Sequence, residues 1–271
     1  MAIIHNNKSI LGSAFDPFVQ KQLKVRSTKL SLDNKDIPKG NILKDPSSLG
    51  YTIGKTAFVR LSSGVNIDST LALRLFNKQS YAGSGLAKNF ILQAGTLNDK
   101  VGLRGGLSGA NSAYTIGGIS DFGLRPMPGI SSVSIESKGR WGSLREASIK
   151  IECFNRDQLS AIEILYCHPG YSVLLEWGHD LFYNNDGNLI NNVSFIDFFE
   201  DGLTRQGLYK KMLDKQKQYA GNFDSFIGPI SNFDIVTNPD GTYSITVKAI
   251  SWGYVIESLK INASSNIPKV S

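Results

Sequence analysis

The stretch from Gly129 to His179 constrains the fold of this chain more than any other, because three strand-like segments flank one helical segment within it. Val133 and Ile135 alternate with polar residues, which is the period of a half-buried strand. After a loop at 138–143, alternation resumes over 147–153, with small or apolar residues on one face and Ser, Lys and Glu on the other. The pattern predicts two strands joined by a loop.

A helix and a third strand are predicted to follow. Asn155 is a suitable N-cap, and Gln158 stands three residues later in the position of a capping box. Pro169 and Gly170 end the helix. The apolar stripe of the helix consists of Leu159, Ile162, Leu165 and Tyr166, and the next strand presents Tyr171, Val173, Leu175 and Trp177 on one face. The helix can cover one face of a sheet, and the other face then needs a second layer or a neighbouring subunit.

Composition favours a β-rich protein with many turns. The chain has 271 residues, enough to bury a sizeable core in one or two domains, and 27 of them are glycine. No stretch is apolar for as long as a membrane-spanning helix requires, and Met1–Lys8 lacks the features of a signal peptide. The two cysteines, Cys153 and Cys167, are expected to be reduced and partly buried, in keeping with assembly in the cytoplasm.

The positive charge is concentrated in the first 44 residues. This arm contains eight basic and three acidic residues, a net charge of 8 − 3 = +5 out of +6 for the whole chain. Its aromatic residues, Phe15 and Phe18, precede the basic run and do not alternate with it, which disfavours nucleic-acid binding. The pattern favours a solvated arm or one that binds a partner.

The other segments are predicted from local patterns. The N-terminal half contains a short helix or extended arm at 18–26, a loop at 31–50, a strand at 55–66, a short apolar segment at 86–93 and an irregular Gly-rich insertion at 95–129. The C-terminal half contains a turn at 184–188, a short helix at 194–200 capped by Ser194, an amphipathic helix at 203–218, a hairpin with strands at 227–237 and 242–250, a short helix at 252–261 and a polar tail at 262–271.

Three sets of residues partly match catalytic or ligand-binding motifs. Residues 50–56 resemble a P-loop, but only three residues separate the glycines and a predicted strand follows. Cys167 and His168 are adjacent in sequence, which rarely brings a nucleophile and its base together. Cys153, Cys167, His168 and His179 match no common zinc spacing. We therefore expect no catalytic residue, no metal site and no cofactor.

Several ordered blocks resemble one protein family. The runs MPGISSV, GSLREASIKIECFNRDQL and LYCHPGYSVLLEWGH, together with PFVQKQLKVR, FVRLSSGVNI and the run from Asn222 to Ile261, look like baseplate hub proteins of contractile phage tails and related injection systems. The blocks span about Asp16 to Ile261. Hub proteins are often longer, with a second tube-type half, so the chain can also represent an N-terminal portion, a shorter adaptor or one half of a split hub.

The resemblance implies an α+β, β-rich fold of the tail-tube type, in which two packed antiparallel sheets, as a barrel or sandwich, are flanked by an α-helix. Residues 1–50 would form an arm and linker, 51–261 the hub domain and 262–271 a flexible tail. The hub domain could contain two related halves that divide near 180–220. The extended arm and the Gly-rich insertion would reach neighbouring proteins.

The resemblance also implies a structural function without catalysis. Hub proteins form a trimeric ring that joins the central spike to the tail tube and lines the channel. The expected partners are further copies of the chain, the spike, tube and baseplate wedge proteins, and DNA in transit, with no membrane anchor. The location would be the baseplate of a virion tail. The alternatives are a hexameric tube initiator, adaptor or tube protein of the same machine, a small Cys/His enzyme and a nucleic-acid-binding protein.

Most of the residues expected at subunit interfaces lie within the blocks that resemble hub proteins. Glu176, in LLEWG, is expected to form a salt bridge or loop anchor across a subunit contact, with Arg145 and Glu146 as its natural partners. Trp141 and Trp177 are expected to be core or interface anchors. The candidate interface residues are Arg145, Glu146, Trp141, Glu176, Trp177, Lys21, Lys24 and Arg26.

Overall fold

The computed structural model describes residues 20–21, 57–95, 127–138, 144–179, 182–183, 189–190, 193–219 and 221–252. Most of the basic arm, the P-loop imitation, most of the Gly-rich insertion, the loop with Trp141, the turn at 184–188 and nearly all of the segment 252–261 lie outside these described residues.

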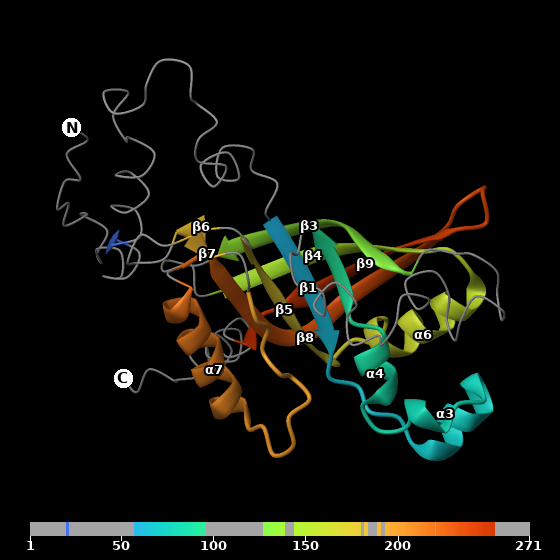
Figure 1. Cartoon of the computed structure of the whole chain (residues 1–271). Helices are drawn as coiled ribbons and strands as arrows, with labels where there is room; N and C mark the ends of the chain where they lie inside the picture. The colour runs from blue at the N-terminus through green and yellow to red at the C-terminus, as the bar shows by residue number, and fades with distance from the viewer. Residues whose placement is uncertain are drawn as a thin grey trace, which may run out of the picture.

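The fold is α+β and strand-rich, and its main element is one antiparallel sheet of seven strands. The strands follow the order β2-β1-β5-β8-β9-β4-β3 (Figure 1). A separate ribbon pairs β6 (Phe182–Tyr183) with β7 (Leu189–Ile190). The strands of the main sheet are β1 (Ala57–Ser63), β2 (Leu92–Gly95), β3 (Gly129–Lys138), β4 (Leu144–Cys153), β5 (Ser172–His179), β8 (Phe223–Thr237) and β9 (Tyr243–Ile250).

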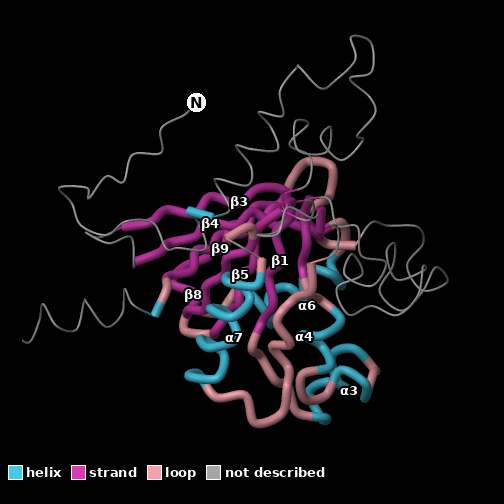
Figure 2. Tube along the Cα trace, turned by 60° about the vertical axis from the view of Figure 1, so that its left-hand side comes forward, coloured by secondary structure: helices cyan, strands magenta, loops and turns pink. Residues whose placement is uncertain are grey.

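The helices gather on one side of this sheet, as Figures 1 and 2 both show. The two longest are α6 (Arg156–Tyr166) and α7 (Arg205–Gln218). Three shorter elements, α3 (Ser69–Phe76), the 3₁₀ turn η1 (Gln79–Tyr81) and α4 (Gly85–Asn89), connect β1 to β2. The buried aliphatic and aromatic side chains form one continuous core between these helices and the sheet.

The sheet curls like half of a barrel. The 15-residue strand β8 pairs with β5 through its first half and with β9 through its second half, with a register shift between Ile230 and Asn232. The two edge strands approach each other, since a Cβ atom at Gly129 would lie 3.6 Å from the carbonyl oxygen of Gln93. The seven strands of the main sheet therefore form one curled sheet, and the short β6–β7 ribbon is separate from it. The predicted α+β, strand-rich class is confirmed, and the tail-tube arrangement of two packed sheets stays a prediction. The curled sheet also unites strands from both of the expected halves.

The strand–loop–strand–helix–strand prediction for Gly129–His179 is confirmed in its elements, since β3, β4, α6 and β5 lie where the pattern placed them. Asn155 caps α6 by accepting a hydrogen bond from the backbone N–H of Gln158 at 2.8 Å. The side chain of Gln158 reaches back to the N–H of Phe154, one residue before the position that a capping box uses. Sequence spacing thus identified the cap Asn155 and its partner Gln158, but not which backbone N–H the Gln158 side chain binds.

β5 is buried on both faces, so the face opposite the predicted apolar one is covered within the chain. Leu174 and Glu176, which alternate with the predicted apolar face, are as buried as Val173 and Leu175. Tyr171, at the start of the segment, is exposed. The reason is position in the sheet: β5 lies between β1 and β8 and is covered on both faces.

The segment 194–200 is not the predicted helix. Ser194 does not act as a cap, because its N–H and hydroxyl both engage the hydroxyl of Tyr219. Further along, Asp197 accepts a hydrogen bond from the N–H of Phe199 and forms a local turn. In contrast, α3 was not predicted, although Asp68 caps it through the N–H of Leu71.

The amphipathic helix and the hairpin near the C-terminus are confirmed. Leu208, Met212 and Tyr219 are buried as the spacing of α7 predicted. Ile245, Val247 and Ala249 are buried on the predicted face of β9, with Tyr243 half-buried at its end. The hairpin turn contains Gly241 in the left-handed region, at φ 82°, where glycine is favoured.

Candidate functional site

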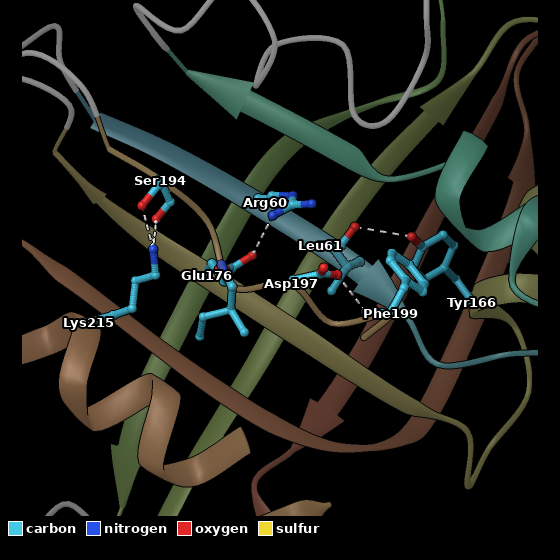
Figure 3. Close-up of polar contacts among 9 residues, drawn as sticks. Arg60, Leu61, Tyr166, Glu176, Ser194, Asp197, Phe199 and Lys215 are labelled. Atoms are coloured by element: carbon cyan, nitrogen blue, oxygen red, sulfur yellow. Dashed lines mark hydrogen bonds and ion pairs between the residues drawn. The ribbon is translucent and has the colours of Figure 1, made fainter. Parts of the chain in front are cut away.

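A buried ion pair between the neighbouring strands β1 and β5 is linked to the segment 193–200. Arg60 on β1 and Glu176 on β5 face each other in the strand register, and their side chains meet at 3.2 Å (Figure 3). The second carboxylate oxygen of Glu176 accepts a hydrogen bond from the N–H of Ile196 at 2.8 Å. Glu176 is 0% exposed. Within the chain it anchors the segment 193–200, and its ion-pair partner is Arg60 rather than Arg145. The expected role at a subunit contact stays a prediction.

Burial raises the pKa of Glu176, while the Arg60 guanidinium and the Ile196 N–H act in the opposite direction. Arg60 also lies over the ring of Phe195, 4.5 Å from its centroid. On the other side of the loop, Lys215 of α7 donates a hydrogen bond to the carbonyl oxygen of Ser194 at 2.8 Å. Two polar contacts from different elements therefore hold the segment 193–200 against the sheet.

Helix α6 is anchored to β1 by its last turn. The hydroxyl of Tyr166 donates a hydrogen bond to the carbonyl oxygen of Phe90 at 2.8 Å and lies 3.1 Å from that of Leu61. The carbonyl oxygen of Leu165 accepts a hydrogen bond from the hydroxyl of Ser63 at 2.7 Å. Because Tyr166 is fully buried, these bonds satisfy a hydroxyl that would otherwise be costly to enclose.

The predicted contact residues Arg145 and Trp177 do lie together. The Arg145 guanidinium pairs with the carboxylate of Asp224 at 2.9 Å and lies 5.4 Å from the ring centroid of Trp177. Trp177 in turn meets Phe226 in an edge-to-face arrangement. Both predicted residues are partly exposed, so this cluster reaches the surface. Asp224 is the partner that sequence reasoning missed.

The remaining candidates are more scattered. Glu146 is half-buried on β4, opposite Glu136 of β3 in the strand register. Lys21 is exposed, at the C-terminal end of a two-residue described segment. Trp141, Lys24 and Arg26 lie outside the described residues.

A groove runs beside the Arg145 cluster, between α7 and the first half of β8. Its volume is about 350 Å³. Its buried lining residues are the apolar Met212, Phe226 and Ile227 and the polar Ser225 and Ser251, and Tyr209 and Leu213 are exposed at its rim. Arg145 and Asp224 provide polar groups at one side. This groove therefore combines a partly apolar interior with one ion pair.

A wider cleft of about 670 Å³ lies at the start of α7. Its lining includes the aromatic residues Phe198, Phe199 and Trp252 and the acidic residues Glu200 and Asp201. The guanidinium of Arg205 lies 4.3 Å from the ring centroid of Trp252, across part of the cleft. Glu200 forms an ion pair with Lys211. The charged groups of this cleft are thus largely engaged with the protein itself.

A polar surface extends over the four strands β3, β4, β9 and β8. In the register of the sheet, Ser132, Lys150, Thr246 and Asp234 form one row across the strands, and Ser134, Ser148, Lys248 and Asn232 form the next. These side chains are exposed or half-buried. The apolar side chains that alternate with them face the core. We call this surface the polar sheet face.

The cysteines are unsuited to nucleophilic chemistry in the folded state. Cys153 on β4 and Cys167 at the end of α6 are both buried and free, as predicted. Burial raises the pKa of each thiol to about 12. His168 is exposed and lies against the ring of Tyr171. A thiol with so high a pKa contains almost no thiolate at neutral pH.

Within the described ranges, no group of three or more His, Cys, Asp or Glu side chains could hold a metal ion. Over the same ranges, no helix has the length and apolar character needed to cross a membrane.

Comparisons with known proteins identify no relative: no family model, no curated protein and no solved structure matches the chain.

Proposed function

We propose that this chain is a structural hub component of a contractile tail, which forms a ring that joins the central spike to the tail tube and lines the channel. The sequence blocks that resemble hub proteins motivate the proposal. A curled antiparallel sheet flanked by helices is compatible with the tail-tube fold that the resemblance implies. We propose the virion baseplate as its location, with spike, tube and wedge proteins as its partners.

The observation that carries the proposal is the polar sheet face. Four strands expose rows of Ser, Thr, Asn and charged side chains, while the described helices gather on the opposite side of the sheet. A broad polar face is suited to line a water-filled channel, because its two rows present polar side chains to a passing chain and the exposed Val236 of the same face lies beyond them, near the hairpin tip. Lys150 and Lys248 on this face would contact DNA phosphates only weakly and reversibly in solution salt.

The proposed role is assembly and conduction, without catalysis. The buried thiols of Cys153 and Cys167 argue against the alternative of a Cys/His enzyme, which would need a reactive thiolate. The buried Arg60–Glu176 pair has a structural explanation as the anchor of the segment 193–200.

The experiment that tests the proposal is native mass spectrometry of the full chain with negative-stain imaging, at rising protein concentration and with neighbouring tail proteins added. A trimeric ring with a central opening is the expected result. A sixfold ring would favour the tube initiator or tube protein of the same machine. A chain that stays monomeric under all these conditions would overturn the proposal.

A further inference from the structure

The hairpin of β8 and β9 projects beyond the rest of the sheet. Figure 1 shows its turn at the end of the molecule opposite α7. Val236, near this tip, is 49% exposed, which makes it the most exposed large apolar side chain among the described residues. Asp234 stands two residues earlier and therefore on the same face of the strand. An apolar side chain beside a carboxylate at the end of a projecting hairpin is a suitable anchor for a partner.

The tip is acidic. Residues 231–245 contain Asp234 and Asp240 and no Lys or Arg, a net charge of −2. Both aspartates are exposed. The carboxylate of Asp240 accepts hydrogen bonds from the N–H and hydroxyl of Thr242, and these bonds lower its pKa. Asp240 therefore keeps its negative charge at neutral pH.

The groove beside α7 has the complementary features. Tyr209 and Leu213 at its rim are 41% and 47% exposed, one helical turn apart on the same face. The helix itself contains Arg205, Lys210, Lys211, Lys215 and Lys217 against Asp214, a net charge of 5 − 1 = +4. Lys210 and Lys217 are exposed. The charged lining residues of the groove, Arg145 and Asp224, are paired with each other, so the net positive charge beside the groove comes from α7. A partly apolar groove beside a basic helix fits an apolar anchor flanked by negative charge.

We propose that the β8–β9 tip of one copy docks into the α7 groove of the next copy. Val236 then fills the groove between Tyr209 and Leu213, and Asp234 and Asp240 face Lys210 and Lys217. Because the two surfaces lie at opposite ends of the chain, the contact is heterologous, and it generates a ring when the rotation closes. This inference rests on the proposed ring assembly and specifies its interface.

The basic N-terminal arm is a poor alternative occupant. Residues 1–44 have a net charge of +5, and α7 has a net charge of +4. Like charges placed in one contact oppose association, whereas the acidic tip and the basic helix attract each other. Charge therefore selects the hairpin tip over the arm.

The test is disulfide trapping between two variants of the full chain. Val236→Cys and Leu213→Cys are purified separately, mixed and oxidised, and the expected product is a disulfide-linked dimer that forms only in the mixture. The native thiols do not interfere, because Cys153 and Cys167 are buried. The matched control is Leu73→Cys on α3, which has the same 47% exposure and lies away from α7 in Figure 1. This control variant should not be trapped with Val236→Cys.

A charge exchange provides the second measurement. Lys210→Glu combined with Lys217→Glu should weaken self-association by about tenfold in sedimentation, and Asp234→Lys combined with Asp240→Lys should do the same. Mixing the two double variants restores complementary charges and should restore association. Circular dichroism of each variant shows that the fold is retained.

The outcomes separate this inference from the proposed function. Rings that form without the Val236–Leu213 link, and that tolerate both charge reversals, would overturn the docking inference and leave the hub proposal standing. A trapped dimer together with open filaments would support the contact and count against a closed ring. A chain that never associates would overturn both.

Discussion

At the scale of single residues, the most consequential pair is Arg60 and Glu176, two charged residues on neighbouring strands. Their side chains form a buried pair, and Glu176 also binds the N–H of Ile196. The Nε atom of Arg60 is buried without a hydrogen-bond partner among the described residues. Such a pair contributes little net stability by itself, but the loss of one partner leaves an enclosed charge.

Glu176→Ala is therefore expected to lower the free energy of unfolding by about 3–5 kcal/mol, because it leaves the Arg60 guanidinium buried without a counter-ion. Glu176→Gln should lower it less, since the amide oxygen still accepts the hydrogen bond from Ile196. Urea denaturation measures both.

The matched control is Glu200→Ala, which breaks the exposed pair with Lys211 and should change the free energy of unfolding by about 0–1 kcal/mol. Equal effects of Glu176→Ala and Glu200→Ala would show that the buried pair does not anchor the segment 193–200.

The two thiols give a prediction about reactivity and pH. Burial raises the pKa of Cys153 from 9.0 to about 12, so at pH 8 the native thiolate fraction falls by about a thousandfold relative to the unfolded chain. Alkylation by iodoacetamide should be slow in the native protein and fast in urea. Since the folded-state pKa is the higher one, the contribution to stability is complete below about pH 9 and is lost as the pH rises toward 12.

Leu213→Cys serves as the reactive control, because that position is exposed. If the native thiols were alkylated as fast in buffer as in urea, the Cys/His enzyme would become the better hypothesis.

At the scale of elements, β8 joins the two parts of the curled sheet. Its pairing with β5 ends at Pro229 and its pairing with β9 begins at Ile230, with a register shift between Ile230 and Asn232. A Cβ atom at Gly228 would lie 1.8 Å from the carbonyl oxygen of Ile250, far closer than any side chain tolerates. Only glycine lets the two strand backbones approach so closely at this point.

Gly228→Ala should consequently destabilise the protein by at least about 3 kcal/mol, since backbone atoms of β9 or β8 must shift. Gly129→Ala is the control, because its Cβ atom would meet the carbonyl oxygen of Gln93 at an ordinary 3.6 Å. Thermal unfolding should separate the two variants, with Gly129→Ala close to the wild type. Similar melting temperatures would contradict the close approach at Gly228.

At the scale of the whole molecule, the charge divides between an arm and a nearly neutral remainder. Residues 1–44 account for +5 of the +6 net charge. Among the described residues, the sheet and helices that form the continuous core begin at Ala57. The proposed assembly therefore separates a folded unit from a basic arm that contacts neighbouring proteins.

Deletion of residues 1–44 is expected to leave the circular dichroism spectrum and melting temperature of the domain nearly unchanged and to reduce binding to neighbouring tail proteins. Pull-down of those proteins at low and high salt measures the effect, which should be largest at low salt. Unaltered ring formation and partner binding after the deletion would remove the arm from the mechanism.

Local sequence patterns determined much of the secondary structure. Alternation located β1, β3, β4 and β9, helical spacing located α7, and Asn155 marked the start of α6. These signals can be recognised in the sequence because hydrophobic periodicity and helix capping depend on residues close together in the chain. The helix predicted at 194–200 was wrong because contacts with distant residues determine this segment. Ser194 forms hydrogen bonds with Tyr219 and Lys215, which are distant in sequence.

The tertiary structure alone decided which side chains meet. Sequence reasoning selected Glu176 and Arg145 but paired them with each other, whereas the strand order gives them Arg60 and Asp224. The curled sheet was likewise beyond local patterns, because β8 pairs with two different strands, β5 and β9, that are distant from each other in sequence. Periodicity fixes which face of a strand is apolar, but the choice of neighbouring strand depends on packing between segments that are far apart in the chain.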